Sequence, residues 1–184
     1  YTQTTPLQLC LMTAQIANGG YKIKPKIIVN NDPLNVDLAK KSMEKQNLLN
    51  PDYKLVKENK NLRIVQEAMF SSTNEIRGTS YRSRIDDPKY QFAGKTGTAQ
   101  VKRISKRERE LDLKIDQIPY NDRDHALYIA YGPYKNPRYA LSIIVEHGGS
   151  GSKAAAPMAK KLFKLIIDRD ELREKQPNFE EISI

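Results

Sequence analysis

The sequence predicts an α+β fold in which an antiparallel β-sheet is covered by helices. Two strongly apolar segments, 126–131 and 139–146, flank a turn rich in glycine and proline, which is typical of a β-hairpin. A third segment of small, β-compatible residues, 92–101, precedes them, and helical patterns occur before and after these strands. This order of helix, helix, strand, hairpin and helix favours three neighbouring antiparallel strands with the last helix packed on the sheet.

The composition is that of one polar-surfaced globular unit. The 184 residues suffice for one domain with an ordinary core, but not for two. No apolar run reaches the roughly 18 residues of a membrane span, so we expect these residues to be soluble, with any targeting information upstream of Tyr1. The net charge is +9, but the lysines are scattered and not interleaved with aromatic residues, so no nucleic-acid partner is predicted.

The first predicted helix covers residues 5–18. Its start and stop residues are Thr5, Pro6 and Gln8, and then Asn18, Gly19 and Gly20. Threonine is a favoured N-cap, proline suits the first helical position, and glutamine three residues after the cap completes a capping box. Because the residues between are apolar nearly all round, we expect the helix to be covered on several sides, with Cys10 as a small core residue.

Two further helices are predicted from their apolar residues, one around 62–70 and a last one over 154–168. The last helix carries one apolar face, and we expect the helix to pack on the sheet. The residues of that face are Met158, Leu162, Leu165 and Ile166.

The remaining segments are polar or only weakly patterned. Residues 21–29 alternate enough for one or two short strands. Residues 30–60 are interpreted as a surface excursion with a short helix at 37–46, and residues 102–124 as a charged loop.

The most informative short motif is Lys95-Thr96-Gly97-Thr98, on the predicted strand 92–101. It matches Lys-Thr-Gly, the third of three motifs in serine acyl-transferases. A lysine there places a positive charge beside a nucleophile and a ligand carboxylate, which the threonine hydroxyls can hydrogen-bond. The glycine lets a ligand backbone lie against the strand as an added partner. The tripeptide alone also fits a tight glycine turn beside an exposed lysine.

Longer segments around the motif add to its specificity. They are Thr5-Pro6-Leu7-Gln8-Leu9, Ala17-Asn18-Gly19-Gly20, Gly78-Thr79, Ala93-Gly94-Lys95-Thr96-Gly97-Thr98-Ala99-Gln100, Arg123-Asp124-His125-Ala126-Leu127-Tyr128, Val145-Glu146-His147-Gly148-Gly149 and Ala155-Ala156-Pro157-Met158-Ala159. Together these segments resemble class B penicillin-binding proteins, and they occur in the family's order. The similarity covers about 5–25 and 62–167, and its histidine-containing segments are closer to the cell-elongation type, penicillin-binding protein 2, than to the division-specific relatives.

The resemblance implies that 1–184 is the C-terminal part of one transpeptidase domain. The intact protein is then a peptidoglycan D,D-transpeptidase, anchored in the bacterial inner membrane upstream of this chain, with this part on the periplasmic side. Lys95 and Thr98 would be catalytic, and the substrate-binding residues would be Thr96, Gly97, Thr98 and Gln100. The implied partners are stem peptides ending in D-Ala-D-Ala, β-lactam antibiotics, a membrane-embedded glycan polymerase and elongation-complex proteins, with no cofactor.

Other matches to the serine motifs are rejected. Ser42-Met43-Glu44-Lys45 and Ser150-Gly151-Ser152-Lys153 fit Ser-x-x-Lys, and Ser72-Thr73-Asn74 fits Ser-x-Asn. A working Ser-x-x-Lys needs its serine at the start of a buried helix, where desolvation lowers the pKa of the lysine. Neither candidate lies in such a segment, so we expect the nucleophile upstream of Tyr1 and an inactive chain.

Two alternative functions stay open at this stage. A β-lactamase or β-lactam sensor would share Lys-Thr-Gly, and a basic nucleic-acid module would need no site at all. His125 and His147 are expected to hydrogen-bond at strand ends rather than to act in catalysis. Asp122, Asp124 and His125 lack a further cysteine or spaced histidine, so no metal is predicted.

Overall fold

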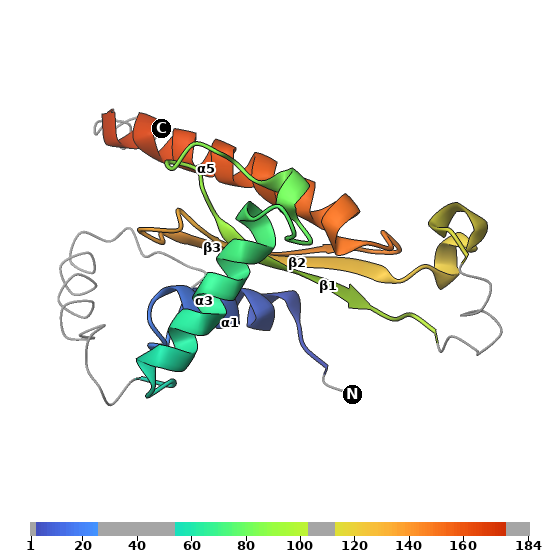
Figure 1. Cartoon of the computed structure of the whole chain (residues 1–184), viewed down its shortest axis with the longest axis horizontal. Coiled ribbons are helices and arrows are strands. Elements are labelled where there is room, and N and C mark those ends of the chain that lie inside the picture. Colours follow the sequence, from blue (N-terminus) through green and yellow to red (C-terminus); the bar gives the residue numbers. More distant parts are fainter. Residues whose placement is uncertain (1–2, 26–53, 103–112, 176–184) are drawn as a thin grey trace, which may run out of the picture.

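The computed structural model describes residues 3–25, 54–102 and 113–175. Its centre is a three-stranded antiparallel sheet, in which β1 (Ala93–Ala99), β2 (His125–Gly132) and β3 (Tyr139–Val145) lie side by side in that order (Figure 1). The predicted strands and the predicted hairpin are confirmed, because β2 pairs with both neighbours in antiparallel register.

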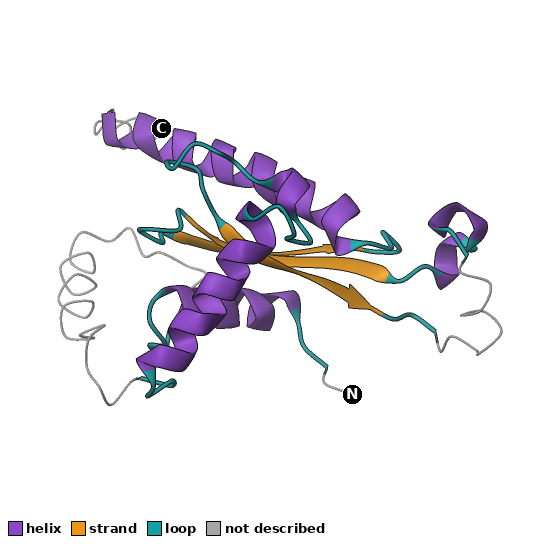
Figure 2. Ribbon diagram, in the orientation of Figure 1, coloured by secondary structure: helices purple, strands orange, loops and turns teal. Residues whose placement is uncertain are grey.

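Helices lie on both faces of this sheet, which confirms the predicted α+β fold (Figure 2). α1 (Pro6–Ala17) and α3 (Asn59–Asn74) pack on one face. α5 (Ala156–Lys175) packs on the other, after a π-helical turn at Gly151–Ala155.

Helix α1 begins and ends where the sequence predicts. The Thr5 hydroxyl accepts a hydrogen bond from the Gln8 backbone N–H (3.2 Å), and the Thr5 N–H donates to the Gln8 side chain (2.8 Å). The two glycines after Asn18 adopt φ angles of +90° and +89°, a region in which glycine carries no steric cost. Within the described residues the helix is only partly covered, since Leu7 is 57% exposed and Met12 is 42% exposed.

Alternate residues of each strand face different helices, as the two-residue period of a strand requires. Tyr128 belongs to a buried cluster with Phe163 of α5. Its neighbours Ile129 and Tyr131 belong to another cluster, with Met69 of α3. Even-numbered positions of β2 therefore face α5, and odd-numbered positions face α1 and α3.

The expected packing of the last helix on the sheet is confirmed, but through a different face from the one that the sequence suggests. Helix α5 contacts the sheet through fully buried Ala156, Ala159 and Phe163. The sheet already presents the bulky ring of Tyr128 on this face, so small residues are needed for close approach of the helix. Of the apolar residues expected on one face, Met158, Leu162 and Leu165 are exposed and Ile166 is partly exposed.

The second helix is longer than expected and only partly buried along its apolar residues. Leu62 and Met69 of α3 are buried, whereas Ile64 is 55% exposed and Val65 is 42% exposed. A helical pattern fixes the kind of element here, but it does not say which side of the helix the described sheet covers.

Several other expectations fall partly or wholly outside the described residues. Residues 26–53, which hold most of the 30–60 excursion and all of the 37–46 helix, lie outside them, and so do residues 103–112. In the described part of 21–29 there is no strand, only an isolated bridge between Tyr21 and Lys54. The described part of the charged loop contains two short 3₁₀ turns, at Ile115–Gln117 and Tyr120–Asp122. No helix in the described part of the chain is long and apolar enough to cross a membrane.

A buried phenol joins the sheet to the end of α3. The Tyr128 hydroxyl lies 2.9 Å from the Thr73 hydroxyl and 3.0 Å from the Ser80 hydroxyl, and all three residues are at most 1% exposed. Burial raises the pKa of the Tyr128 phenol, and the hydrogen bonds with Ser80 and Thr73 oppose that increase. The ring reaches α3 by crossing strand β1 at Gly94, where a Cβ atom would lie 2.5 Å from the Tyr128 Cζ.

The loop that leads into β1 is fastened to α5. Lys89 forms an ion pair with Glu171 (2.7 Å), and the Tyr90 hydroxyl donates a hydrogen bond to Asp168. The hydrogen bond from Tyr90 lowers the pKa of the Asp168 carboxyl. These contacts and the Tyr128 hydroxyl fix both the approach to β1 and its first residues.

We expect Gly94→Ala to destabilise the protein that carries this chain by about 1–3 kcal/mol, because the new methyl group displaces the Tyr128 ring. The measurement is urea-induced unfolding at equilibrium. Gly97→Ala, two residues along the same strand, is the matched control, since its methyl group would meet only the Leu127 Cβ, at 3.3 Å. Equal stability of the two variants would contradict the crossing of Tyr128 over Gly94.

Candidate active site

The Lys-Thr-Gly motif lies on β1, at the edge of the described sheet. β1 pairs with β2 along its whole length, and no described strand pairs with its other side. Lys95 and Thr98 are exposed, and Thr96 and Gly97 are partly exposed. An edge strand with an unpaired side can accept an extended peptide as an additional strand. The structure thus places the predicted site residues 95–98 together on an accessible edge, with exposed Gln100 directly after the strand.

The side chains of the motif alternate between the two faces of the sheet. Lys95 is paired with Ile129, on the face of α1 and α3, and Thr96 is paired with Tyr128, on the face of α5. The Lys95 ammonium group donates a hydrogen bond to the Thr96 carbonyl oxygen (2.8 Å) and lies 3.5 Å from the Thr96 hydroxyl. The charge of Lys95 therefore stays beside the strand, close to the hydroxyl group of the next residue.

Gly97, at the centre of the motif, packs against Gly151 of the turn before α5. A Cβ atom on Gly151, in the π-helical turn before α5, would lie 2.8 Å from the Gly97 carbonyl oxygen, so only glycine fits there without a shift. A Cβ atom on Gly97 would meet only Leu127. Packing within the described residues therefore demands glycine at position 151 more strongly than at position 97, where the added atom would meet one side-chain atom at 3.3 Å.

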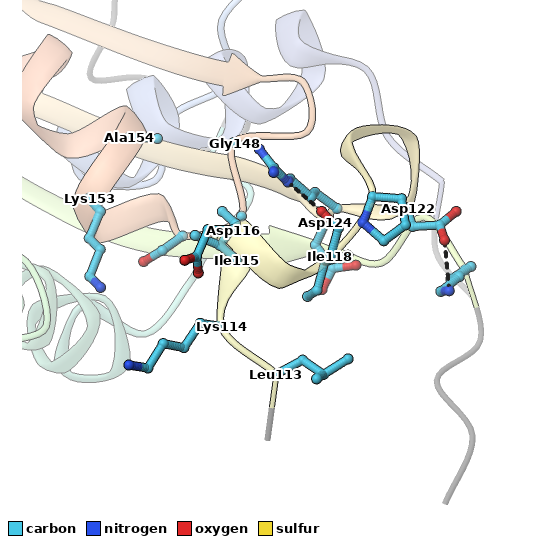
Figure 3. A pocket seen from close by; sticks show the side chains of 15 residues that line it. Leu113, Lys114, Ile115, Asp116, Ile118, Asp122, Asp124, Gly148, Lys153 and Ala154 are labelled. Atoms are coloured by element: carbon cyan, nitrogen blue, oxygen red, sulfur yellow. Dashed lines mark hydrogen bonds and ion pairs between the residues drawn. The ribbon is translucent and has the colours of Figure 1, made fainter. Parts of the chain in front are cut away.

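A pocket of about 1010 Å³ opens beyond the end of β1 (Figure 3). It is lined by Lys102 and by residues of the segments 113–124 and 148–154. The side chains of Lys114 and Lys153 extend from separate segments on the same side of this pocket (Figure 3). None of the motif residues 95–98 lines it, so the pocket and the candidate catalytic edge are separate features.

The two histidines hydrogen-bond at the strand ends, as expected. The His147 backbone N–H donates to the His125 Nδ1 (2.9 Å), so this nitrogen carries no proton. The His147 Nδ1 lies 3.0 Å from the Arg123 carbonyl oxygen, which can only accept, so this nitrogen is the donor. Beside them, the Asp124 carboxylate accepts a hydrogen bond from the Val101 N–H (3.3 Å), which ties this loop to the end of β1.

The rejected serine motifs have local structural contacts. In the last turn of α3, the Asn74 side chain donates to the Phe92 carbonyl oxygen (2.9 Å), and Thr73 contacts the buried phenol. The Ser150 hydroxyl lies 3.0 Å from the Ser152 hydroxyl in the glycine-rich corner before α5. Ser42 lies outside the described residues.

Sequence reasoning assigned no role to Thr79, which the structure places beside the motif. The Thr79 Oγ1 lies 3.3 Å from the Thr96 Oγ1. The available signal was the Gly78-Thr79 pair before the motif, but spacing alone cannot show that a residue 17 positions away reaches the strand. Among the residues that the structure describes, no three histidine, cysteine, aspartate or glutamate side chains gather as a metal site.

Comparison with curated proteins gives relatives that include several MrdA proteins. The peptidoglycan D,D-transpeptidase MrdA of Salmonella typhimurium is 31% identical over 169 residues, which are 91% of this chain and 26% of that protein. MrdA of Acinetobacter baumannii is 34% identical over 162 residues, which are 86% of this chain and 22% of that protein. The chain thus spans about a quarter of the length of these relatives.

Solved structures agree with the sequence relatives. PBP2 of Pseudomonas aeruginosa in complex with WCK 5153 superposes with a TM-score of 0.61 at 30% identity, over 90% of this chain and 31% of that one. PBP2 of Helicobacter pylori in complex with MreC gives a TM-score of 0.58 at 32% identity, over 88% of this chain and 25% of that one. The family model of the penicillin-binding protein transpeptidase domain matches residues 2–164. The chain therefore belongs to the penicillin-binding protein transpeptidase domain family.

Proposed function

We propose that this chain is the C-terminal part of a transpeptidase domain and forms one wall of the active site of a peptidoglycan D,D-transpeptidase. The observation that carries the proposal is the position of Lys95-Thr96-Gly97-Thr98 on an accessible edge strand, with no described strand on its free side. A donor stem peptide would lie along this edge as an added strand, with its terminal carboxylate near Thr96 and Thr98.

In the proposed reaction, a serine oxygen attacks the carbonyl carbon of the penultimate D-Ala and the terminal D-Ala leaves as the amine. An amine of a neighbouring stem peptide then attacks the acyl-enzyme, which forms the crosslink and frees the serine. Lys95 would supply positive charge beside the serine and assist proton transfer. The Thr98 backbone N–H would stabilise the oxyanion that forms at each attack.

The nucleophilic serine belongs, in this proposal, to a part of the protein outside this chain. Among the described serine candidates, the Ser150 hydroxyl lies 3.0 Å from the Ser152 hydroxyl in a glycine-rich corner, and Ser72 lies partly exposed in the last turn of α3. Contrary to the expectation from the sequence, Ser150 does precede a buried helical turn, Gly151–Ala155, but Lys153 of its Ser-x-x-Lys match is exposed, whereas a working motif needs a desolvated lysine. The lengths of the curated relatives leave room for the remaining motifs.

The subtype and surroundings follow from the same relatives. We propose an elongation-type enzyme that is anchored in the inner membrane by an upstream segment and works in the periplasm beside a glycan polymerase. The similarity to a PBP2 crystallised with MreC supports partners from the elongation complex. The curated transpeptidase relatives favour this reaction over a β-lactamase or a sensor, and slow hydrolysis of the penicilloyl-enzyme would distinguish them.

We expect Lys95→Ala in the full-length protein to lower the second-order rate of acylation by penicillin about 10²–10³-fold, or ~3–4 kcal/mol. The free energy of unfolding should change by less than about 0.5 kcal/mol, because Lys95 is exposed and its hydrogen bonds within the described residues go to the adjacent Thr96. Stopped-flow acylation and thermal unfolding measure the two quantities. Acylation of Lys95→Ala at the wild-type rate would mean that the motif is a chance match.

Two variants on the same strand separate charge from shape. Gly97→Val should reduce acylation comparably, since a branched side chain would stand on the strand where the ligand backbone is proposed to lie. Thr98→Val should weaken carboxylate binding but keep the backbone N–H, so its loss should be smaller than that of Lys95→Ala.

The 184-residue chain alone is expected to form no covalent adduct with a fluorescent penicillin, because its nucleophile is supplied from elsewhere. Intact-mass analysis after incubation measures this directly, and the full-length protein is the positive control. A stoichiometric adduct on Ser42 or Ser150 would contradict the proposal that the serine lies outside this chain.

A further inference from the structure

Three hydroxyl groups form a line from the end of α3 to the motif strand. The Ser72 Oγ lies 3.2 Å from the Thr79 Oγ1, which in turn lies 3.3 Å from the Thr96 Oγ1. We call Ser72, Thr79 and Thr96 the hydroxyl chain. Its last member is the motif threonine that we have proposed as a ligand for the substrate carboxylate.

The backbone on both sides of Thr79 is held against α3, although the side chain itself is exposed. Gly78 packs so closely on the last turn of the helix that an added Cβ atom would lie 2.5 Å from the Ser71 carbonyl oxygen. On the other side, the Ser80 N–H and the Ser80 hydroxyl both donate to the Ser72 carbonyl oxygen, each at 3.0 Å. The contacts of Gly78 and Ser80 with α3 therefore hold Thr79 beside β1.

The buried Tyr128 hydroxyl further fixes the position of Ser80. Ser80 is 1% exposed, and its hydroxyl also lies 3.0 Å from the Tyr128 hydroxyl. Tyr128 is the strand partner of Thr96. The position of Thr79 relative to Thr96 is therefore fixed by a fully buried contact between the same two segments, not by the exposed hydroxyl groups alone.

The hydrogen-bonding capacity of the hydroxyl groups gives this line a direction. A hydroxyl group has one proton to donate and two lone pairs that accept. Among the described residues, two hydrogen-bonding groups lie within 3.5 Å of the Thr96 Oγ1: the Lys95 ammonium group, which can only donate, and the Thr79 hydroxyl. If Thr79 donates as well, both lone pairs of Thr96 are occupied, and its own proton is left for an anion. Ser72 can then donate to Thr79 and complete the chain.

We propose that Thr79 is a positioning residue that turns the Thr96 hydroxyl outward as a donor to the carboxylate of the substrate or of a β-lactam. The proposal rests on the proposed function of this site. Each donor in such a chain polarises the next, so the hydrogen bond to the carboxylate is stronger than one from an isolated threonine. Thr79 itself contacts no reacting atom.

The test uses the full-length protein and two forms of one penicillin, the free carboxylate and the corresponding carboxamide. Thr79→Val keeps the shape of the side chain but removes the donor. We expect it to lower the second-order acylation rate for the carboxylate roughly fivefold and the rate for the neutral carboxamide less than twofold. The wild-type protein should prefer the carboxylate, and Thr79→Ser should restore its rate to within about twofold of wild type.

Matched variants separate this role from a structural one. Ser72→Ala should cause a smaller loss that again affects only the carboxylate. Ser71→Ala is the control, because the Ser71 hydroxyl lies on the same turn but bonds to Glu75 (2.8 Å) and not to the hydroxyl chain. All variants should keep the wild-type melting temperature, since Thr79 is exposed.

The possible failures are distinguishable. A wild-type protein that is not acylated at all would overturn the proposed function. A normally acylated wild type with an unaffected Thr79→Val variant would overturn only the positioning role. An equal loss for both ligands, or a wild type that does not prefer the carboxylate, would also overturn it, because the effect would then not pass through the carboxylate contact.

Discussion

The hydrogen bonds of the Tyr128 hydroxyl are the interaction on which the arrangement of the site depends. This one group joins the middle strand, the last turn of α3 through Thr73, and the following loop through Ser80. All three hydroxyl groups are buried, and Thr73 and Ser80 also bond to the Met69 and Ser72 carbonyl oxygens, so the Tyr128 hydroxyl connects two groups that are already fixed to α3. Strand β1 runs beneath this crossing, and its position relative to α3 is fixed as a result.

An edge strand needs such support when it must stay unpaired and rigid at once. An unpaired edge exposes backbone groups and is held from one side only. Here β1 is held from its paired side by β2, from one face by Gly151, and at its start by Asn74 and the loop that is fastened to α5. The motif is thus presented on a stiff backbone, which lowers the entropic cost of binding an extended ligand.

The sequence was informative where local chemistry decides the structure. The Thr5 capping box and the β2–β3 hairpin depend on residues close in sequence, and both formed as predicted. The strand position of the Lys-Thr-Gly motif was predictable from its small residues and from the resemblance of the surrounding segments. The family assignment was recoverable for the same reason, since several short segments in a fixed order are far more specific than one tripeptide.

Long-range packing was not recoverable. The prediction of which face of α5 covers the sheet was wrong. That face is determined by the space that the rings of Phe92 and Tyr128 leave, and alanine side chains fit this space better than leucine side chains. The role of Thr79 was missed because its contact with Thr96 spans 17 residues and requires the Gly78 turn to be known. Hydrophobic periodicity shows that one face of a helix is apolar, but it does not identify the element against which that face packs.

The close packing of Gly151 against Gly97 bears on how drug resistance can arise in penicillin-binding transpeptidase domains. Gly151 lies against the backbone of both Leu127 and Gly97, from the side of the sheet opposite to Lys95, so a larger residue at 151 would displace the two strands where they pair. If β1 binds β-lactams as proposed, a substitution at 151 would alter the binding edge through its backbone rather than through a side chain of the motif. Surveys of resistant variants restricted to the motif residues would overlook it.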